Sequence, residues 1–348
     1  MDKKNLKYYL LFSLCLVSLL TSFNFKETTH QFAKNLKDVS EIIPTLSNVH
    51  YGQDPMQVLD FWQYRSEKPT PLVIYIHSGG WAGGDKNSIQ TGGPDSWAGF
   101  KNPAGKNINM KNELLTELIN AGISVIAINY RFVTAAQKAG IKPPVKWPME
   151  DAKRTLQYIR CMAKKWNIDK ERIGLMGTSA GACSSMWLAM HDDMSDLKSR
   201  DTLERESTRV FCVAVLDGQT TLDPKQLFEW FKSPVYGAHA FGFVINQGNK
   251  VVSDMNSFIA ARDNILPWIK EYSPIEWASP DDPPICLAFS EAPQPFNEPQ
   301  LNSVHGASFG INLKKKFDQM GVECHVIYQQ SADSSYSKQV GFMIEKLK

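Results

Sequence analysis

The sequence predicts an α/β fold in which a mostly parallel central sheet carries helices on both faces. Short, continuously apolar runs such as 71–77 and 123–128 indicate strands that are buried on both sides, as strands of parallel sheets usually are. Amphipathic runs such as 149–166 separate these strands, and the alternation continues along the chain. In such a sheet the carboxyl ends of the strands meet at one edge, where we expect the functional residues.

The strands differ in their expected burial. The first, 57–64, is expected to be half-buried, because Leu59 and Phe61 alternate with Asp60. The others are apolar throughout, which favours strands covered by helices on both faces. We place these other strands at 71–77, 123–128, 172–176, 210–216, 285–289 and 322–328.

Helices are expected where apolar residues recur every three or four positions. The clearest is 149–166, and Pro148 stands just before it, where helix starts favour proline. Two long stretches, about 85–110 and 223–281, interrupt the alternation and are interpreted as insertions. The remaining helices are placed at 111–120, 180–190, 306–320 and 338–348.

The second insertion is rich in aromatic residues. These residues either line an acyl or aromatic pocket or form the buried faces of helices, and the buried faces are the more common outcome for such a run. The residues are Phe228, Trp230, Phe231, Tyr236, Phe241 and Phe243.

Composition limits the classes of partner. Of the 348 residues, 43% are hydrophobic and 21% are charged, which is ordinary for a globular protein. The formal net charge is +2, and Lys3, Lys4 and Lys7 against Asp2 account for it. The rest of the chain is close to neutral, so it lacks the basic surface that nucleic-acid binding requires.

Residues 1–22 are expected to be a signal peptide, which implies export to the periplasm or beyond. Basic residues precede an apolar run at 8–20, and Thr21 and Ser22 offer small residues for cleavage. The run is short for a membrane span, and an uncleaved anchor is the alternative. No other contact with a membrane is expected. Residues 23–50 are interpreted as an irregular lead-in to a single domain over 51–348.

No motif for a cofactor or a metal occurs in the sequence. The six cysteines are scattered, with neither metal-ligand spacing nor a clear disulfide framework. Gly79 and Gly80 lack the Gly-x-Gly-x-x-Gly spacing of a dinucleotide site, and there is no phosphate loop. We therefore expect no cofactor and no metal.

The strongest motif is Gly-Thr-Ser-Ala-Gly at 177–181, between the predicted strand 172–176 and the predicted helix 180–190. A serine on a sharp strand-to-helix turn points outward, beside the free N–H groups of the helix. The motif predicts that Ser179 is a nucleophile. The alternative is a tight structural turn.

A second motif, His-Ser-Gly-Gly at 77–80, follows a buried strand. Its glycines let the backbone come close to a substrate carbonyl oxygen and offer their N–H groups to it. Together with the N–H that follows the serine, this predicts an oxyanion hole made by Gly79, Gly80 and Ala180. The alternative is a glycine-rich turn. His77 is expected to hold the loop by a hydrogen bond.

Further short motifs accompany these two: Leu59-Asp60-Phe61, Gly83-Gly84-Asp85-Lys86, Asn129-Tyr130-Arg131 and Asp151. With 77–81 and 177–181, they resemble the α/β-hydrolases of the esterase and lipase branch that carry a His-Gly-Gly-Gly oxyanion motif, including secreted feruloyl- and acetyl-esterase-like enzymes. The resemblance covers about 55–190, whereas 191–348 matches only in the order of strands and helices. It implies the α/β-hydrolase fold and cleavage of small-molecule or glycan-linked carboxylic esters through an acyl-enzyme at Ser179.

The resemblance also implies an acid after the next-to-last strand and a histidine after the last one. The segment after the last predicted strand, 329–337, holds no histidine, and His325 lies within the strand itself. We therefore expect His305, at the start of the helix 306–320, to be a relocated base that the helix dipole keeps neutral. The alternative for His305 is a polar residue at a helix start.

Glu291 follows the strand 285–289 and is the expected acid partner of His305, with Asp333 and Asp217 as alternatives. The predicted function is a cofactor-free serine hydrolase that cleaves carboxylic esters. A degenerate hydrolase fold that binds an ester, a glycan or a protein without turnover is the alternative. It is favoured by the missing C-terminal histidine and opposed by the intact serine and glycine motifs.

Overall fold

The computed structural model describes residues 42–91, 114–233, 236–248, 250–293, 304–329, 331, 333, 335, 336 and 338–348. The chain divides into residues 1–42 and residues 43–348, and the strands and helices of the described part lie in the second unit. The predicted signal peptide and most of the predicted lead-in lie outside the described residues, as does most of the first predicted insertion.

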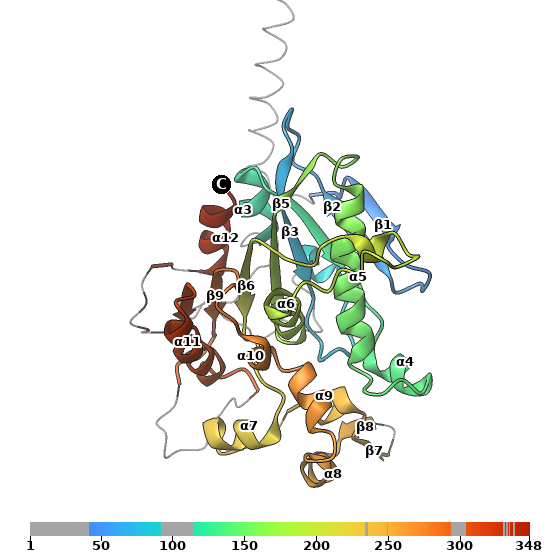
Figure 1. Cartoon of the computed structure of the whole chain (residues 1–348), viewed down its shortest axis with the longest axis vertical. Coiled ribbons are helices and arrows are strands. Elements are labelled where there is room, and N and C mark those ends of the chain that lie inside the picture. Colours follow the sequence, from blue (N-terminus) through green and yellow to red (C-terminus); the bar gives the residue numbers. More distant parts are fainter. Residues whose placement is uncertain are drawn as a thin grey trace, which may run out of the picture. The chain divides into compact units, whose positions relative to one another are not determined.

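In the described part, eight strands form one sheet in the order β1-β2-β4-β3-β5-β6-β9-β10 (Figure 1). Strand β2 pairs antiparallel with β1 and β4, and all other neighbours in this sheet are parallel. The predicted, mostly parallel sheet is therefore confirmed. The strands are β1 (Leu46–His50), β2 (Val58–Trp62), β3 (Thr70–Ile76), β4 (Ser124–Ile128), β5 (Ile168–Thr178), β6 (Cys212–Leu216), β9 (Ile285–Ala288) and β10 (Cys324–Ile327).

Helices connect these strands, and those predicted at 149–166, 180–190, 306–320 and 338–348 are confirmed with small shifts at their ends. The predicted helix 111–120 is described only in its second half, as α3. The helices are α2 (Ser88–Thr91), α3 (Thr116–Asn120), α4 (Val133–Lys138), α5 (Lys146–Met162), α6 (Ala180–Met190), α11 (Ser308–Met320) and α12 (Gln339–Leu347), with the 3₁₀ turn η2 (Leu203–Arg205).

Both faces of the sheet are covered, because alternate side chains of a strand point into different layers. On β6, Val213 and Val215 belong to the same core as Met186 of α6. Cys212 points the other way, and its Sγ lies 3.6 Å from Sδ of Met343 on α12. The prediction of helices on both faces is thus confirmed, and the structure has the α/β-hydrolase fold.

Two predictions at the antiparallel edge are wrong. The end of the lead-in, predicted as irregular, forms β1 and pairs with β2. Strand β2 is buried throughout rather than half-buried. Its Asp60 can lie inside because Nζ of Lys86 approaches Oδ2 of Asp60 to 2.9 Å and balances its charge.

The second predicted insertion, 223–281, folds into short helices and a hairpin, which Figure 1 shows grouped beyond one end of the central sheet. Most of its aromatic side chains are buried or partly buried, which confirms the interpretation as buried faces; Phe228 is the exception and is 55% exposed. The elements are α7 (Pro224–Phe231), η3 (Ala238–Phe241), β7 (Val244–Gln247), β8 (Lys250–Ser253), α8 (Met255–Ala261), α9 (Leu266–Glu271) and α10 (Pro274–Trp277).

Candidate active site

Ser179 stands at the sharp turn between β5 and α6. Its backbone has φ 52° and ψ −117°, a conformation that costs energy for a residue with a side chain. Gly177 and Gly181 permit the turn, since a Cβ at Gly181 would collide with the carbonyl oxygen of Ile76. The N–H of Ser179 donates to the carbonyl oxygen of Leu216 at 3.0 Å. The turn is thereby fixed between β3 and β6, at the carboxyl edge of the sheet.

The structure brings His305 to this serine. Oγ of Ser179 lies 2.9 Å from Nε2 of His305, which is hydrogen-bond distance. His305 lies between β9 and α11 in the chain. The carbonyl oxygen of the preceding Val304 accepts a hydrogen bond of 2.7 Å from Nε2 of Gln219, which follows β6. Gln219, which follows β6, thus helps to hold His305 beside Ser179, which follows the neighbouring strand β5.

The charge state of His305 suits a base. Burial lowers the pKa of His305 to about 4, so the imidazole is neutral at neutral pH. A neutral ring can accept the serine proton at Nε2. The structure supplies a cause that the sequence did not indicate, namely burial of the ring, and α11 itself begins three residues later, at Ser308.

No contact among the described residues joins His305 to any of the acids predicted as its partner. The side chain of Glu291 is exposed to solvent. Oδ2 of Asp333 lies 3.0 Å from Nδ1 of His325 on β10, so Asp333 belongs to a different pair. The structure therefore pairs Asp333 with His325, and the acid partner of His305 stays a prediction.

Asp217 ties two strand ends together. It is fully buried after β6, with φ 53°. Its carboxylate accepts hydrogen bonds from the N–H of Ser290 at 2.9 Å and from the Ser290 hydroxyl at 2.7 Å. Burial raises the pKa of Asp217 to about 7, although these hydrogen bonds oppose the shift. Asp217 thereby links the end of β6 to the start of the segment that leads to His305.

The loop after β3 carries two of the predicted oxyanion donors. Gly79, Gly80 and Trp81 have successive positive φ values of 104°, 59° and 57°. A Cβ at Gly79 would collide with the backbone of Gly83, which explains the glycine there. Among the hydrogen bonds between described residues, none uses the N–H of Gly79, Gly80 or Ala180 as donor. These three N–H groups can therefore serve an oxygen of a bound ligand.

Side chains from two directions hold this loop. Nδ1 of His77 donates to the carbonyl oxygen of Ser78 at 2.7 Å, and the ring stacks on Tyr130 with centroids 4.2 Å apart. The indole N–H of Trp81 donates to Oγ of Ser184 on α6 at 2.9 Å. The expected structural role of His77 is confirmed, and Trp81 links the loop to the helix that follows Ser179.

The other motif residues form a polar network beside the loop. The N–H of Lys86 donates to Oδ1 of Asn129 at 2.6 Å, and Nδ2 of Asn129 donates to Asp85 at 2.7 Å. The guanidinium of Arg131 pairs with Asp151, with a shortest N···O distance of 2.6 Å. These motifs therefore support the loop 77–84 and its surroundings.

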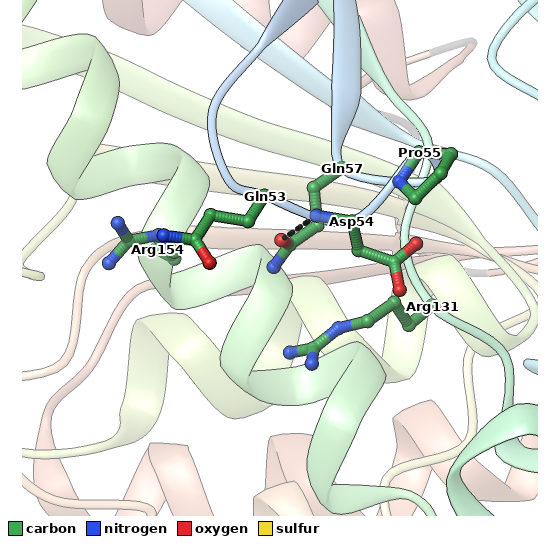
Figure 2. A pocket seen from close by; sticks show the side chains of 6 residues that line it. All are labelled: Gln53, Asp54, Pro55, Gln57, Arg131 and Arg154. Atoms are coloured by element: carbon green, nitrogen blue, oxygen red, sulfur yellow. Dashed lines mark hydrogen bonds between the residues drawn. The ribbon is translucent and has the colours of Figure 1, made fainter.

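A surface pocket of ≈ 510 Å³ lies at this network and includes no residue of the serine turn (Figure 2). Its two arginines already bind protein carboxylates, because Arg131 pairs with Asp151 at 2.6 Å and Arg154 pairs with Asp201 at 2.7 Å. We therefore assign no catalytic part to this pocket. Its lining residues are Gln53, Asp54, Pro55, Gln57, Arg131 and Arg154.

Sequence reasoning missed one residue at the loop, His239 on η3. Its Nε2 lies 3.0 Å from the carbonyl oxygen of Gly80, although the two residues are 159 positions apart in the chain. No motif surrounds His239. The only signal in the sequence is its place between the aromatic residues Tyr236 and Phe241.

Over the described ranges, no group of three or more histidine, cysteine, aspartate or glutamate side chains could hold a metal ion. The same part of the chain contains no helix long and apolar enough to cross a membrane. The cysteines described there are free thiols, and all but Cys161 are buried.

Two curated relatives match parts of the chain. Esterase LipC of Mycobacterium tuberculosis is 28% identical over 137 residues, which cover 38% of this chain and 27% of that protein. Endo-1,4-beta-xylanase B of Butyrivibrio fibrisolvens is 36% identical over 81 residues, which cover 23% of this chain and 12% of that protein. The chain thus spans only a minor part of the length of these relatives.

Solved structures match over most of the chain. A truncated carbohydrate esterase from gut microbiota has a TM-score of 0.58 at 20% identity, covering 88% of this chain and 98% of that one. An acetyl ester-xyloside bifunctional hydrolase from Caldicellulosiruptor lactoaceticus has a TM-score of 0.55 at 19% identity, covering 88% and 97%. A butyrate-bound esterase from Thermogutta terrifontis has a TM-score of 0.52 at 13% identity, covering 85% and 90%. Because the sequence identities are this low, the similarity to these structures shows only that the chain shares their fold.

The family comparison covers Ser179 and His305 of the candidate site and begins after the loop that contains Gly79 and Gly80. The model of the BD-FAE family matches residues 92–305, more than half of the chain. The match contains the serine turn and ends at His305. The chain therefore belongs to the BD-FAE family, within the esterase and lipase branch of the α/β-hydrolases.

Proposed function

We propose that this chain hydrolyses carboxylic esters through an acyl-enzyme on Ser179, with His305 as the general base. The observation that carries the proposal is the distance of 2.9 Å between Oγ of Ser179 and Nε2 of His305. The esterase names of a relative and of similar structures support the ester class.

Acylation begins when Oγ of Ser179 attacks the carbonyl carbon of the ester and Nε2 of His305 takes the hydroxyl proton. The carbonyl oxygen becomes an oxyanion that accepts hydrogen bonds from the N–H groups of Gly79, Gly80 and Ala180. Each such donor typically contributes about 3 kcal/mol of transition-state stabilisation. His305 then gives its proton to the leaving alkoxide oxygen, so the alcohol departs and the acyl group stays on Ser179.

Deacylation repeats these steps with water. Nε2 of His305 takes a proton from water as the water oxygen attacks the acyl carbon, and the same N–H groups bind the second oxyanion. The bond between the acyl carbon and Oγ of Ser179 breaks, and His305 returns its proton to that oxygen. The carboxylic acid leaves and the free enzyme is restored.

The acid that supports the imidazolium stays a prediction, with Glu291 first and Asp217 second. Asp217 follows β6, which lies next to β5 in the sheet, and Glu291 follows β9, which lies next to β6. Loss of the acid in a serine triad typically lowers kcat by about 10⁴-fold. Comparing Glu291→Gln with Asp217→Asn identifies the acid as the variant whose kcat falls on that scale.

A fluorophosphonate probe tests the nucleophile, because it reacts with an activated serine hydroxyl. We expect the wild type to be labelled and Ser179→Ala to remain unlabelled. Replacement of the exposed Ser66 by alanine is the matched control and should label like the wild type. A wild type that takes no label would refute the proposal and favour a binding protein without turnover.

We propose small or glycan-linked esters with short acyl groups as the substrates. The support comes from similar structures that are described as a carbohydrate esterase, an acetyl ester-xyloside hydrolase and an esterase with bound butyrate. The test compares p-nitrophenyl acetate, p-nitrophenyl palmitate and acetylated xylan at equal enzyme concentration. Faster hydrolysis of the palmitate than of both acetyl substrates would refute this substrate class.

We further propose that residues 1–22 direct export and are then removed. The basic residues before the apolar run 8–20 support this. Expression of the full chain in a Gram-negative host, followed by fractionation and N-terminal sequencing, tests it. We expect periplasmic protein that begins after Ser22. Membrane-bound protein with an intact N-terminus would support the uncleaved anchor instead.

A further inference from the structure

The oxyanion loop has a second histidine against it, from the segment 223–281. The ring of His239 packs directly against the loop: if Gly80 carried a Cβ, that atom would lie 3.5 Å from Nε2 of His239. This Nε2 is 3.0 Å from the carbonyl oxygen of Gly80. On the other side of the ring, Nδ1 lies 3.5 Å from Oγ of Ser253 on β8. The imidazole therefore bridges the oxyanion loop and the hairpin β7–β8.

These partners define where the proton of the ring sits. A carbonyl oxygen only accepts, so Nε2 of His239 carries the proton and donates it to Gly80. Burial lowers the pKa of His239, which keeps the ring neutral and leaves Nδ1 as an acceptor for the hydroxyl of Ser253. Both ring nitrogens are thus used in one orientation of the side chain.

The short helix that carries His239 is itself anchored. The N–H of Val145 at the start of α5 donates to the carbonyl oxygen of Ala240 at 3.0 Å. The side-chain amide of Gln137 on α4 donates to the carbonyl oxygen of Gly242 at 3.2 Å. Ala240 is fully buried. The imidazole is therefore held on backbone that is fastened to the helices around the sheet.

A hydrogen bond to Gly80 restrains the part of the loop whose backbone is least restrained by its own side chains. Gly80 stands between Gly79 and Trp81 in a run of three positive φ angles. Glycine has little steric barrier to rotation, so nothing in Gly80 itself keeps its two peptide planes oriented. A fixed carbonyl oxygen holds the peptide plane that follows the Cα of Gly80, and in this short loop that limits how far the preceding plane, which carries the Gly80 N–H, can turn.

We propose that His239 is a positioning residue that keeps the N–H groups of Gly79 and Gly80 directed at the oxyanion. The proposal rests on the ester-hydrolase function proposed above and deepens it. It gives the segment 223–281 a part in stabilising the transition state. Because the negative charge on the carbonyl oxygen is absent in the bound ester and develops only as the nucleophile attacks, loss of the hydrogen bond should lower kcat and leave KM unchanged.

Three substitutions separate the hydrogen bond from packing. His239→Gln keeps an N–H donor at the reach of Nε2, His239→Asn places its amide at the reach of Nδ1, and His239→Leu has no donor. For p-nitrophenyl acetate we expect the Leu and Asn variants to lose about 10- to 100-fold in kcat, less than or comparable to loss of a direct oxyanion donor. The Gln variant should stay close to the wild type. Equal losses in the Gln and Leu variants, wild-type kcat in all three, or a change in KM alone would overturn the proposal.

Amide hydrogen exchange of the peptide that contains 77–84 gives a readout that needs no turnover. We expect about tenfold faster exchange in His239→Leu than in the wild type and unchanged exchange in His239→Gln, with thermal unfolding midpoints measured to confirm folding. If the wild type takes no fluorophosphonate while exchange still responds in this way, the proposed function fails and the hold of His239 on the loop stands. If the wild type is labelled and His239→Leu is labelled and exchanges at the wild-type rate, the inference on His239 fails and the proposed function stands.

Discussion

The chain up to the end of α6 and the chain after it contribute to the site in different ways. In the first part, polar motif residues contact one another beside the loop 77–84, as Lys86 does with Asp60 and Asn129. In the second part, single side chains reach the site from separate elements, as His305 and His239 do. The polar motif residues of the first part thus form a buried network of hydrogen bonds and ion pairs, which we call the frame. The second part supplies single side chains, and each acts through one contact at the site.

This difference predicts different consequences of substitution. A change in the frame leaves buried polar groups without partners, and such groups cost stability. A change in one of the isolated histidines removes a proton acceptor or a hydrogen-bond donor and leaves the frame in place. Substitutions of the buried polar motif residues should therefore act on folding, and substitutions of the isolated histidines should act on rate.

The largest expected effect is on the base. His305→Ala should lower kcat for a short aryl ester by about 10³- to 10⁴-fold, because Ser179 then has no base. The matched control is His325→Gln, which changes another histidine of this part of the chain, one that pairs with Asp333. We expect the control to retain wild-type kcat. Full activity in His305→Ala together with no activity in Ser179→Ala would show that the base is another residue.

The next effect is on the frame. Lys86→Met should lower the free energy of unfolding by about 3–5 kcal/mol, because it leaves the charge of Asp60 buried without its partner. The side chains of Lys86 and Asp60 are only 5% and 4% exposed. The control, Lys314→Met, breaks the exposed pair with Asp318 on α11 and should cost less than about 0.5 kcal/mol. Urea denaturation measures both, and equal costs would remove the distinction between the two parts of the chain.

The smallest expected effect is a shift of the acid limb of the pH–rate profile to lower pH. Because burial lowers the pKa of His305 to about 4, the base stays neutral and active down to that pH. The value of kcat/KM for a short aryl ester should therefore fall only as the pH drops through about 4, in place of the ordinary histidine range near about 6.5. Burial of a neutral histidine also stabilises the fold above its unfolded-state pKa, and this contribution is lost as the pH falls toward 4. Unfolding at each pH is the control, and an acid limb near 6.5 would contradict the burial of His305.

Much of the site could be predicted because its parts are local. The serine turn needs small residues at 177 and 181 next to Ser179, and the loop after β3 needs glycine at 79 and 80. The histidine was within reach only by elimination, since no histidine follows the last strand. The burial that lowers its pKa was not predicted, because burial depends on what packs around the ring in three dimensions.

The acid shows where such reasoning stops. Glu291 follows β9, as the family pattern implies, yet its side chain is exposed. Asp217, the less favoured candidate, is buried and binds Ser290. Position after a strand locates a residue at the correct edge of the sheet, but it does not determine the direction of the side chain or the partner it finds.

The sequence by itself determined the parallel sheet, the serine turn and the glycine loop, because each depends on residues that are adjacent or regularly spaced in the chain. Only the tertiary structure decided that His305 meets Ser179 and that His239 holds Gly80. These contacts join residues 126 and 159 positions apart. Such pairs depend on the spatial order of the strands in the sheet and on where the segment 223–281 packs. A local pattern of side chains predicts neither.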